Sequence, residues 1–396
     1  MPSDSLYSAR PVWAEINLDH LAHNIKQFKD LVGPETQIMA VVKADAYGHG
    51  AIEVSKVALE AGAASLAVAF LEEAVELRRA NIKAPILLLG YTDPVYSTTL
   101  LDYKLTPTVF GFETASEFSA RASELGVELP VHIKVDTGMG RIGLLPEEAL
   151  EVVSRIVNLP NLKIEGLFTH FAAAEEINNS YTESQLNLFI RIHESCLEKG
   201  ISFPMLHAAN TAGAINYKGS HFNAIRLGIG MYGCYPDVGM ESDNLQLYPA
   251  LSLKSRVVLV KKVPPGTAIS YGCTYRTAKE SLIATIPIGY ADGYSRLQSN
   301  RGHIIVRGER AKVAGRVCMD HLMADVSHIP GVRLGDEVVI YGRQGNREVK
   351  VEEAAGNAGT INYEILCAIG KRVPRLYFGD GLLASVHDFI EDRYVR

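Results

Sequence analysis

The chain has 396 residues, of which 47% are apolar and 21% are charged, proportions that are typical of a soluble globular enzyme. Its formal net charge of −6, with no local block of lysine or arginine, argues against a nucleic-acid-binding protein. The 5 cysteines include no CxxC pair, so we expect neither a metal site nor a disulfide framework. Residues 1–11 lack the features of a signal peptide, and no stretch has the length of a membrane span. We therefore expect a cytoplasmic protein without a membrane partner.

An alternation of apolar runs and amphipathic segments follows the first 32 residues, where a short alternating segment (13–18) leads into a helix. This pattern predicts a (β/α)8 barrel, with an open doubly wound sheet as the alternative. The glycine spacing after the first run does not match a dinucleotide-binding fingerprint. The predicted strands are 38–42, 65–70, 85–89, 106–110, 131–135, 164–168, 204–207 and 224–227, and helices are predicted at 52–61, 71–80, 114–125, 146–157 and 183–199.

The composition changes after a polar loop at 237–247, and the following pattern is rich in short strands and turn residues. We predict two domains, a barrel over residues 1–243 and a mainly antiparallel β domain over residues 244–396. Strands of the second domain are predicted at 251–260, 282–288, 303–306, 311–313, 323–326 and 337–341, with helices at 351–358 and 363–369.

Lys43 stands at the end of the first predicted barrel strand. Burial of an ammonium group without a partner is costly, so an apolar strand that delivers a lysine to its end has two interpretations. Lys43 is either a surface residue or a desolvated amine that acts as a nucleophile and forms a Schiff base. Tyr47, one turn further on, could place its hydroxyl beside the group that the lysine holds.

Polar residues also follow four other predicted barrel strands, and the active site of such a barrel forms at the C-terminal ends of its strands. Each of these residues has a structural alternative, since a histidine can be a core residue and an arginine a surface charge. Together they predict one site. The residues are Asp136 and Arg141, Thr169 and His170, His207 to Thr211, and Arg226 to Gly230.

The segments after the last two predicted barrel strands indicate a phosphate site. Gly228 and Gly230 allow a ligand to approach the backbone, and Asn210 and Thr211 lie where a helix begins. Phosphate sites of barrels often lie after the seventh and eighth strands. A lysine at the first strand and a phosphate site at the last two suggest a phosphate-bearing aldehyde held as a Schiff base, and pyridoxal 5'-phosphate fits that description.

Eight motifs between about residue 13 and residue 375 resemble, in the same order, those of the alanine racemase family of fold-type III pyridoxal-phosphate enzymes. The resemblance implies a cofactor-binding barrel, a β-rich C-terminal domain and a homodimer in which the two subunits share each active site. It also implies interconversion of L- and D-alanine, which supplies D-alanine for peptidoglycan. The motifs are VVKADAYGHG, KVDTGMGRIG, THFA, HAANTA, RLGIGMYG, SYG, VCMD and INYE.

Two catalytic bases are implied by this resemblance, because racemisation removes the α-proton on one face and returns it on the other. Lys43 would hold the cofactor and exchange the proton of the D-isomer, and Tyr271 of the partner subunit would exchange that of the L-isomer. His170 would contact this tyrosine, with Arg226 and then His207 behind it. Arg226 would also donate to the ring nitrogen of the cofactor and leave it unprotonated, which favours racemisation over transamination.

The resemblance assigns the remaining site residues as follows. The cofactor-binding residues would be Lys43, Tyr47, His170, Asn210, Thr211, Arg226, Gly228, Ile229 and Tyr363; the substrate-binding residues Arg141 and, from the partner, Met319; and the supporting residues Lys134, His207 and Asp320. Lys134 is carbamylated in many relatives, and the alternative is an unmodified lysine in a salt bridge. Thr211 replaces the serine that we expect there, and His321 replaces a glutamine.

Several other functions fit part of the pattern. A broader or serine-preferring racemase of the same fold is not excluded by any sequence feature. A decarboxylase is disfavoured by Arg226, since such enzymes need an acidic residue to protonate the ring. A non-enzymatic pyridoxal-phosphate carrier would lack the second domain, and a cofactor-free aldolase would not need the phosphate site or Tyr363.

Overall fold

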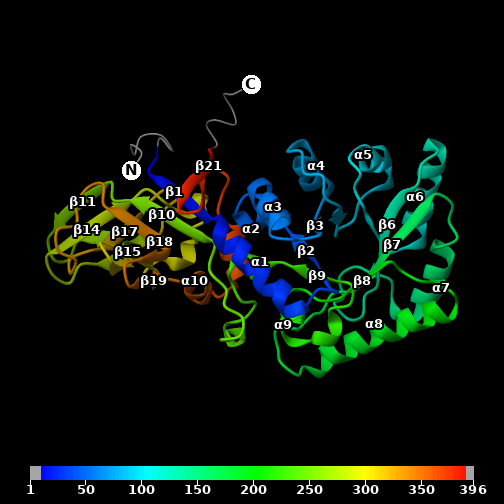
Figure 1. Cartoon of the computed structure of the whole chain (residues 1–396). Helices are drawn as coiled ribbons and strands as arrows, with labels where there is room; N and C mark the ends of the chain where they lie inside the picture. Colours follow the sequence, from blue (N-terminus) through cyan, green and yellow to red (C-terminus); the bar gives the residue numbers. More distant parts are fainter. Residues whose placement is uncertain (1–9, 389–396) are drawn as a thin grey trace. The chain divides into compact units, whose positions relative to one another are not determined.

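A computed structural model of the chain describes residues 10–388, and these residues form two compact units (Figure 1). One unit comprises Leu21–Ala46 and Ala51–Tyr248. The other comprises residues 10–20, Tyr47–Gly50 and residues 249–388. The division predicted from the sequence, 1–243 and 244–396, follows the chain and therefore does not describe the short segments that belong to the second unit.

The first unit is the predicted (β/α)8 barrel. Its parallel strands form two ladders, β4-β3-β2-β9 and β5-β6-β7-β8. The ladders are joined where Leu88 N donates to Thr106 O over 2.9 Å and where Asn223 N donates to Leu206 O over 3.1 Å. All eight predicted strands are confirmed, β9 with its predicted bounds and the others with one or both ends shifted: β2 (Gln37–Val41), β3 (Ser65–Val68), β4 (Ile86–Leu88), β5 (Thr108–Val109), β6 (Leu129–Lys134), β7 (Leu162–Phe168), β8 (Met205–His207) and β9 (Ala224–Leu227).

The longer helices of the barrel unit bury one face each. In α7 (Pro146–Ile156) the buried residues are Ala149, Val153 and Ile156, which lie on one face at helical spacing. α6 (Phe112–Leu125) begins two residues before the predicted start, because Gly111 takes the N-cap position. The other helices are α1 (Leu18–Val32), α2 (Lys43–Gly48), α3 (Ala51–Glu60), α4 (Leu71–Arg79), α5 (Ser97–Asp102), α8 (Ser180–Glu198) and α9 (Thr211–Asn216).

The second unit is built on a mainly antiparallel sheet with the order β11-β14-β17-β16-β15-β18-β10-β1-β20-β21 (Figure 1). β1 (Val12–Asn17) buries alternate residues and pairs with β10 and β20, far away in the sequence. The other elements are β10 (Leu251–Arg256), β11 (Leu259–Val263), β12 (Ala268–Ile269), β13 (Tyr275–Arg276), β14 (Ser281–Ile286), β15 (His303–Val306), β16 (Glu309–Val313), β17 (Leu322–Asp325), β18 (Glu337–Gln344), β19 (Arg347–Val349), α10 (Val351–Ala358), α11 (Asn362–Cys367), β20 (Arg375–Gly379) and β21 (Leu382–His387).

None of the helices in residues 10–388 is both long and apolar enough to span a membrane. Nor does this range contain a group of three or more histidine, cysteine, aspartate or glutamate side chains that could hold a metal ion.

Candidate active site

The strand-end residues of the barrel unit gather at one end of the barrel, as predicted. Lys43 lies two residues after the end of β2, Lys134 ends β6, and Arg226 lies in β9. Burial lowers the pKa of His170, and the positive charges of these three residues and of Arg141 lower it further. The barrel therefore brings five predicted site residues from four parts of the chain into one cluster.

The turn after Lys43 has an unusual backbone. Ala44, Asp45, Ala46 and Tyr47 have φ angles of 52° to 54°, so four consecutive non-glycine residues form a left-handed turn. This conformation costs about 1–2 kcal/mol per residue. Backbone strain of this kind persists only where other contacts impose it, and it is frequent at functional sites.

Two carboxylates hold this turn to the barrel unit. The amide of Ala44 donates to Glu73 Oε1 over 2.6 Å, and the amide of Ala51 donates to Asp45 Oδ1 over 2.9 Å. Glu73 also accepts from the amide of Ala69 over 2.7 Å, after β3. The sequence predicted that the chain turns here, but nothing in it indicated the left-handed conformation.

Arg226 is the centre of a buried hydrogen-bond network and is 3% exposed. Its Nη1 donates to His207 Nδ1 over 2.7 Å and to His207 O over 3.0 Å. Its Nη2 donates to Thr169 O over 2.7 Å, Ala208 O over 2.8 Å and His170 Nδ1 over 3.1 Å. Burial, and then the positive charge of Arg141, lower the pKa of Arg226 to about 9, so Arg226 remains a cation at neutral pH.

This network fixes the tautomers of three histidines. A guanidinium group only donates, so the Nδ1 atoms of His170 and His207 must accept, and their protons lie on Nε2. His207 Nε2 then donates to His132 Nδ1 over 3.0 Å. Burial, and then Arg226, lower the pKa of His132 to about 4 and those of the other two histidines well below their usual value. All three are therefore neutral at pH 7.

His132 is a member of this network that the sequence analysis missed. It lies in β6 two residues before Lys134, and residues at this spacing face the same side of a strand. This spacing was the signal that could have found it. The neighbouring residue of β7 is Gly166, where a Cβ atom would lie 2.5 Å from the His132 ring, so only glycine leaves space for it.

The ring of Phe168 contacts three polar side chains of this cluster, His207, Arg226 and Lys134. Its ring stacks on His207 with a centroid separation of 4.6 Å and an interplanar angle of 10°. Arg226 Cζ and Lys134 Nζ lie 5.4 Å and 5.6 Å from the centroid of the same ring. Cation–π contacts of this kind stabilise buried positive charges.

Lys134 is 3% exposed, and none of residues 10–388 gives its amine a hydrogen bond or an ion pair. The salt bridge considered as the alternative to carbamylation is therefore not found. Burial, followed by the charges of Arg141, Arg226 and Lys43, lowers the pKa of Lys134 to about 7. Much of this amine is therefore uncharged at neutral pH, beside three cationic groups.

Asp136 organises the loop that carries Arg141. Its Oδ1 accepts from the amides of Gly138 and Gly140 over 2.9 Å and 3.1 Å, and its Oδ2 accepts from the amide of Arg141 over 3.0 Å. Partial burial opposes ionisation of this carboxyl, but these amides outweigh it and lower its pKa. Asp136 thus acts on the backbone of the loop, and the Arg141 residue is exposed.

The predicted phosphate site is formed by α9 and the segment after β9. Thr211 Oγ1 accepts from the amides of Gly228 over 3.1 Å and Gly230 over 3.4 Å. Asn210 is the N-cap of α9 and accepts from the amide of Gly213 over 2.8 Å. A Cβ atom at Gly230 would lie 2.6 Å from the ring of Phe28, so this segment needs glycine. The structure brings the four predicted residues, including Ile229, together.

Tyr47 and Tyr363 lie together in the other unit, where their ring centroids are 6.0 Å apart. Burial, and then the neighbouring Cys367, raise the pKa of Tyr47 well above its usual value, so its hydroxyl stays protonated. Arg375 holds the same segment, because its Nε and Nη2 donate to Gly48 O over 3.2 Å and 3.1 Å.

Tyr271 and Met319 are exposed side chains of the β-rich unit. Tyr271 follows β12 and is 70% exposed, and Met319 is 53% exposed. The preceding Ser270 has a φ of 64° and donates from Oγ to Arg316 O over 2.6 Å. Asp320 Oδ1 accepts from Arg372 Nη2 over 2.7 Å, and His321 is exposed.

Comparisons with known proteins agree with this architecture. The family described as "Alanine racemase, N-terminal domain" matches residues 16–236, and "Alanine racemase, C-terminal domain" matches residues 250–377. The alanine racemase of Desulforamulus reducens is 50% identical over 370 residues, which are 93% of this chain and 99% of that protein.

Solved structures give the same result. The alanine racemase of Clostridium difficile 630 has a TM-score of 0.92 and 40% identity, and the match covers 97% of this chain and 100% of that one. A histidine racemase of Leuconostoc mesenteroides has a TM-score of 0.86 and 29% identity, with 94% and 99% covered.

The barrel, the β domain and these similarities define an amino-acid racemase, which is an isomerase. The chain belongs to the alanine racemase family.

Proposed function

We propose that this enzyme interconverts L- and D-alanine with pyridoxal 5'-phosphate, acts as a homodimer with shared active sites, and supplies D-alanine for peptidoglycan. Lys43 and Tyr271 of the partner subunit are the two bases. The observation that carries the proposal is the barrel cluster, in which an amine, an amide-lined phosphate site and a fixed cationic donor lie at one end of the strands.

The donor set fits the cofactor. Pyridoxal 5'-phosphate needs an amine for its aldehyde, donors for its phosphate and a partner for its ring nitrogen. Lys43 supplies the amine. Thr211 supplies a hydroxyl and Ile229 an amide for the phosphate, and the amide of Gly228 would donate to the phosphate in place of Thr211 Oγ1. Both Nη atoms of Arg226 are held by protein acceptors, whereas its Nε–H has no hydrogen-bond partner among residues 10–388 and is left for the ring nitrogen.

Bound pyridoxal phosphate supplies an electron sink that acidifies the substrate α-carbon. Arg226 limits this effect, since a guanidinium that donates a hydrogen bond and keeps its proton leaves the ring nitrogen unprotonated. The residue is held by five acceptors and cannot turn away without leaving several of them unpaired. We infer that Arg226 favours proton return over transamination.

The two bases are supported by the network around them. Lys43 would accept a proton on Nζ, and its amine belongs to the cluster that contains Lys134, Arg141 and Arg226. Because the proton of His170 lies on Nε2, this histidine can donate to the phenolate oxygen of Tyr271 of the partner subunit and stabilise the anion. Each positioned base contributes roughly 10²–10⁴-fold in rate.

The remaining roles concern the substrate and the charge balance. Arg141 and the amide of Met319 of the partner subunit would bind the substrate carboxylate. We also propose that Lys134 is carbamylated, since its uncharged amine can react with carbon dioxide and the resulting anion would pair with Arg141. The hydroxyls of Tyr47 and Tyr363 would also donate hydrogen bonds to the phosphate.

A broader racemase is the second candidate, because a histidine racemase shares this fold at 29% identity. The test measures racemisation of L-alanine, D-alanine, L-serine and L-histidine by circular dichroism. We expect turnover of both alanine isomers and much slower turnover of the others. Lys43→Ala should remove the activity, and the matched control Lys163→Ala, an exposed lysine paired with Glu165, should retain it. Absence of alanine turnover by the cofactor-loaded protein would refute the proposal.

A further inference from the structure

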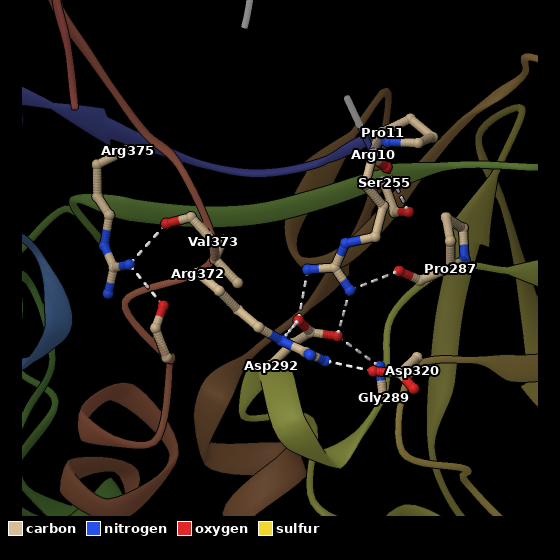
Figure 2. A network of polar contacts seen from close by, with 11 residues as sticks. Arg10, Pro11, Ser255, Pro287, Gly289, Asp292, Asp320, Arg372, Val373 and Arg375 are labelled. Carbon is tan, nitrogen blue, oxygen red and sulfur yellow. Dashed lines mark hydrogen bonds and ion pairs between the residues drawn. The ribbon is translucent and has the colours of Figure 1, made fainter. Parts of the chain in front are cut away.

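Asp292 is a fully buried carboxylate in the β-rich unit that the proposed mechanism does not use. Arg10 binds it through two bonds, from Nη2 to Oδ1 over 2.6 Å and from Nη1 to Oδ2 over 3.0 Å. Arg372 Nε donates to Oδ1 over 2.7 Å, and the amide of Gly289 donates to Oδ2 over 2.9 Å (Figure 2). Each oxygen of the carboxylate therefore accepts two hydrogen bonds, and the charge is fully compensated.

Arg372 connects this carboxylate to Asp320. Its Nε donates to Asp292, and its Nη2 donates to Asp320 Oδ1 over 2.7 Å, so one guanidinium bridges two acidic residues (Figure 2). Together with Arg10, the cluster contains two positive and two negative charges. Removal of the Asp292 charge would leave two arginines facing each other across a buried neutral group, with only Asp320 to compensate them.

The turn that carries Asp292 also holds the backbone around Met319. The amide of Tyr290 donates to Cys318 O over 3.0 Å, and the amide of Ala291 donates to Met319 O over 3.0 Å. A Cβ atom at Gly289 would lie 2.3 Å from both of these carbonyl oxygens, so the two segments touch backbone to backbone.

This contact fixes the direction of one N–H group. In a trans peptide the C=O of one residue and the N–H of the next point in opposite directions. Tyr290 holds Cys318 O, so the N–H of Met319 points away from the Asp292 turn. In the proposed function, this N–H group binds the substrate carboxylate in the active site of the partner subunit.

We propose that Asp292 is a positioning residue for substrate binding, which acts through the turn at 289–292 and through Arg372 to hold the Met319 amide and the Asp320 carboxylate in place. This inference rests on the proposed function, since it depends on the role of Met319. A looser Met319 segment should weaken carboxylate binding in the ground state and the transition state alike, which appears mainly as a higher KM.

The test compares Asp292→Asn with the wild type in the cofactor-loaded enzyme. Both oxygens of Asp292 accept hydrogen bonds, whereas the NH2 group of an asparagine can only donate. The substitution therefore removes at least one of the hydrogen bonds that hold the turn. We expect KM to rise by about tenfold or more for both alanine isomers, with a smaller change in kcat, because the loss of a hydrogen bond to a charged group loosens the turn that holds the Met319 segment.

The control is Asp336→Asn, since Asp336 is a partly buried carboxylate in the same unit that lies within 3.6 Å of two other arginines, Arg307 and Arg333, and is not part of this cluster. It should leave KM unchanged. If Asp292→Asn does not fold, Arg372→Gln tests the same link, because it keeps the Arg10–Asp292 pair and removes the bridge to Asp320.

Coupling between the two acidic residues gives a readout that a purely structural role would not change. Addition of Asp320→Asn to Arg372→Gln should raise KM by less than Asp320→Asn does in the wild type. A folded Asp292→Asn or Arg372→Gln enzyme with a KM within twofold of the wild type would overturn the inference. A wild-type enzyme that does not racemise alanine would instead refute the proposed function.

Discussion

The histidine network predicts that His132 controls the stability of the barrel unit in a pH-dependent way. His132 Nδ1 accepts from His207 Nε2, so the matched substitutions His132→Asn and His132→Leu test this single bond. The two replacements have similar shapes, but only asparagine offers an acceptor near the position of Nδ1. Both leave a similar space beside Gly166, so the difference between them reports the hydrogen bond.

The magnitude follows from the burial of this pair. In the leucine variant the Nε2–H of His207, which is 0% exposed, loses its acceptor, and this costs roughly 1–3 kcal/mol. The pH dependence has a defined sign. The pKa of His132 is lowered to about 4 in the folded protein, whereas it is about 6.5 in the unfolded chain, so stability is lost as the pH falls from 6.5 to 4. At pH 5 this loss is roughly 2 kcal/mol.

The assay is urea unfolding followed by far-ultraviolet circular dichroism at pH 8 and pH 5. At pH 8, His132→Leu should be less stable than His132→Asn by roughly 1–3 kcal/mol. Between pH 8 and pH 5, the wild type should lose roughly 2 kcal/mol more than His132→Asn, which has no group to protonate at this position. Equal stability of the two variants at pH 8, together with equal pH dependence of the wild type and the asparagine variant, would refute the assigned tautomers and their direction of donation.

Three further predictions concern the cofactor site. Thr211→Val removes the acceptor of two buried amides and should weaken cofactor binding by tenfold or more, whereas Thr211→Ser should keep it; equal affinities by absorbance titration would contradict this. Gly230→Ala should lower both the melting temperature and the cofactor affinity, because its Cβ would lie 2.6 Å from Phe28, and a variant with wild-type values would show that the segment can move. Enzyme supplied with 13C-bicarbonate should give a carbamate signal by NMR that Lys134→Met lacks, and a spectrum without that signal would remove the proposed modification.

The barrel could be predicted because its information is local. Parallel strands covered on both faces are continuous apolar runs, and a long helix such as α7 buries residues at helical spacing along one face. The polar residues at the strand ends stand out against this background. The phosphate site that we propose was predicted in the same way, from Asn210 and Thr211 after β8 and from Gly228 and Gly230 after β9.

The parts that could not be predicted depend on contacts that are distant in the sequence. The alternation of β1 shows that it is a strand, but not that its partners are β10 and β20. β12 and β13 have two residues each and flank Tyr271, and such short pairs have no periodicity to detect. Asp292 looks like an ordinary turn residue in Asp292-Gly293, and only the structure reveals its burial between Arg10 and Arg372.

The left-handed turn after Lys43 was missed for another reason. Its residues, Ala44 to Tyr47, have no intrinsic preference for a positive φ, and the conformation is imposed by Glu73 and by the amide of Ala51. Local propensity at these residues therefore favours the right-handed conformation, which the structure does not adopt.

The central claim is that Lys43 binds pyridoxal 5'-phosphate covalently. The most direct test is reduction of the cofactor-loaded enzyme with borohydride, followed by digestion and mass spectrometry of the modified peptide. We predict that the yellow absorbance disappears and that the pyridoxyl group is found on Lys43, with none on Lys134. A colourless protein that gains no visible band with added cofactor, or a reduced adduct on another lysine, would contradict the account.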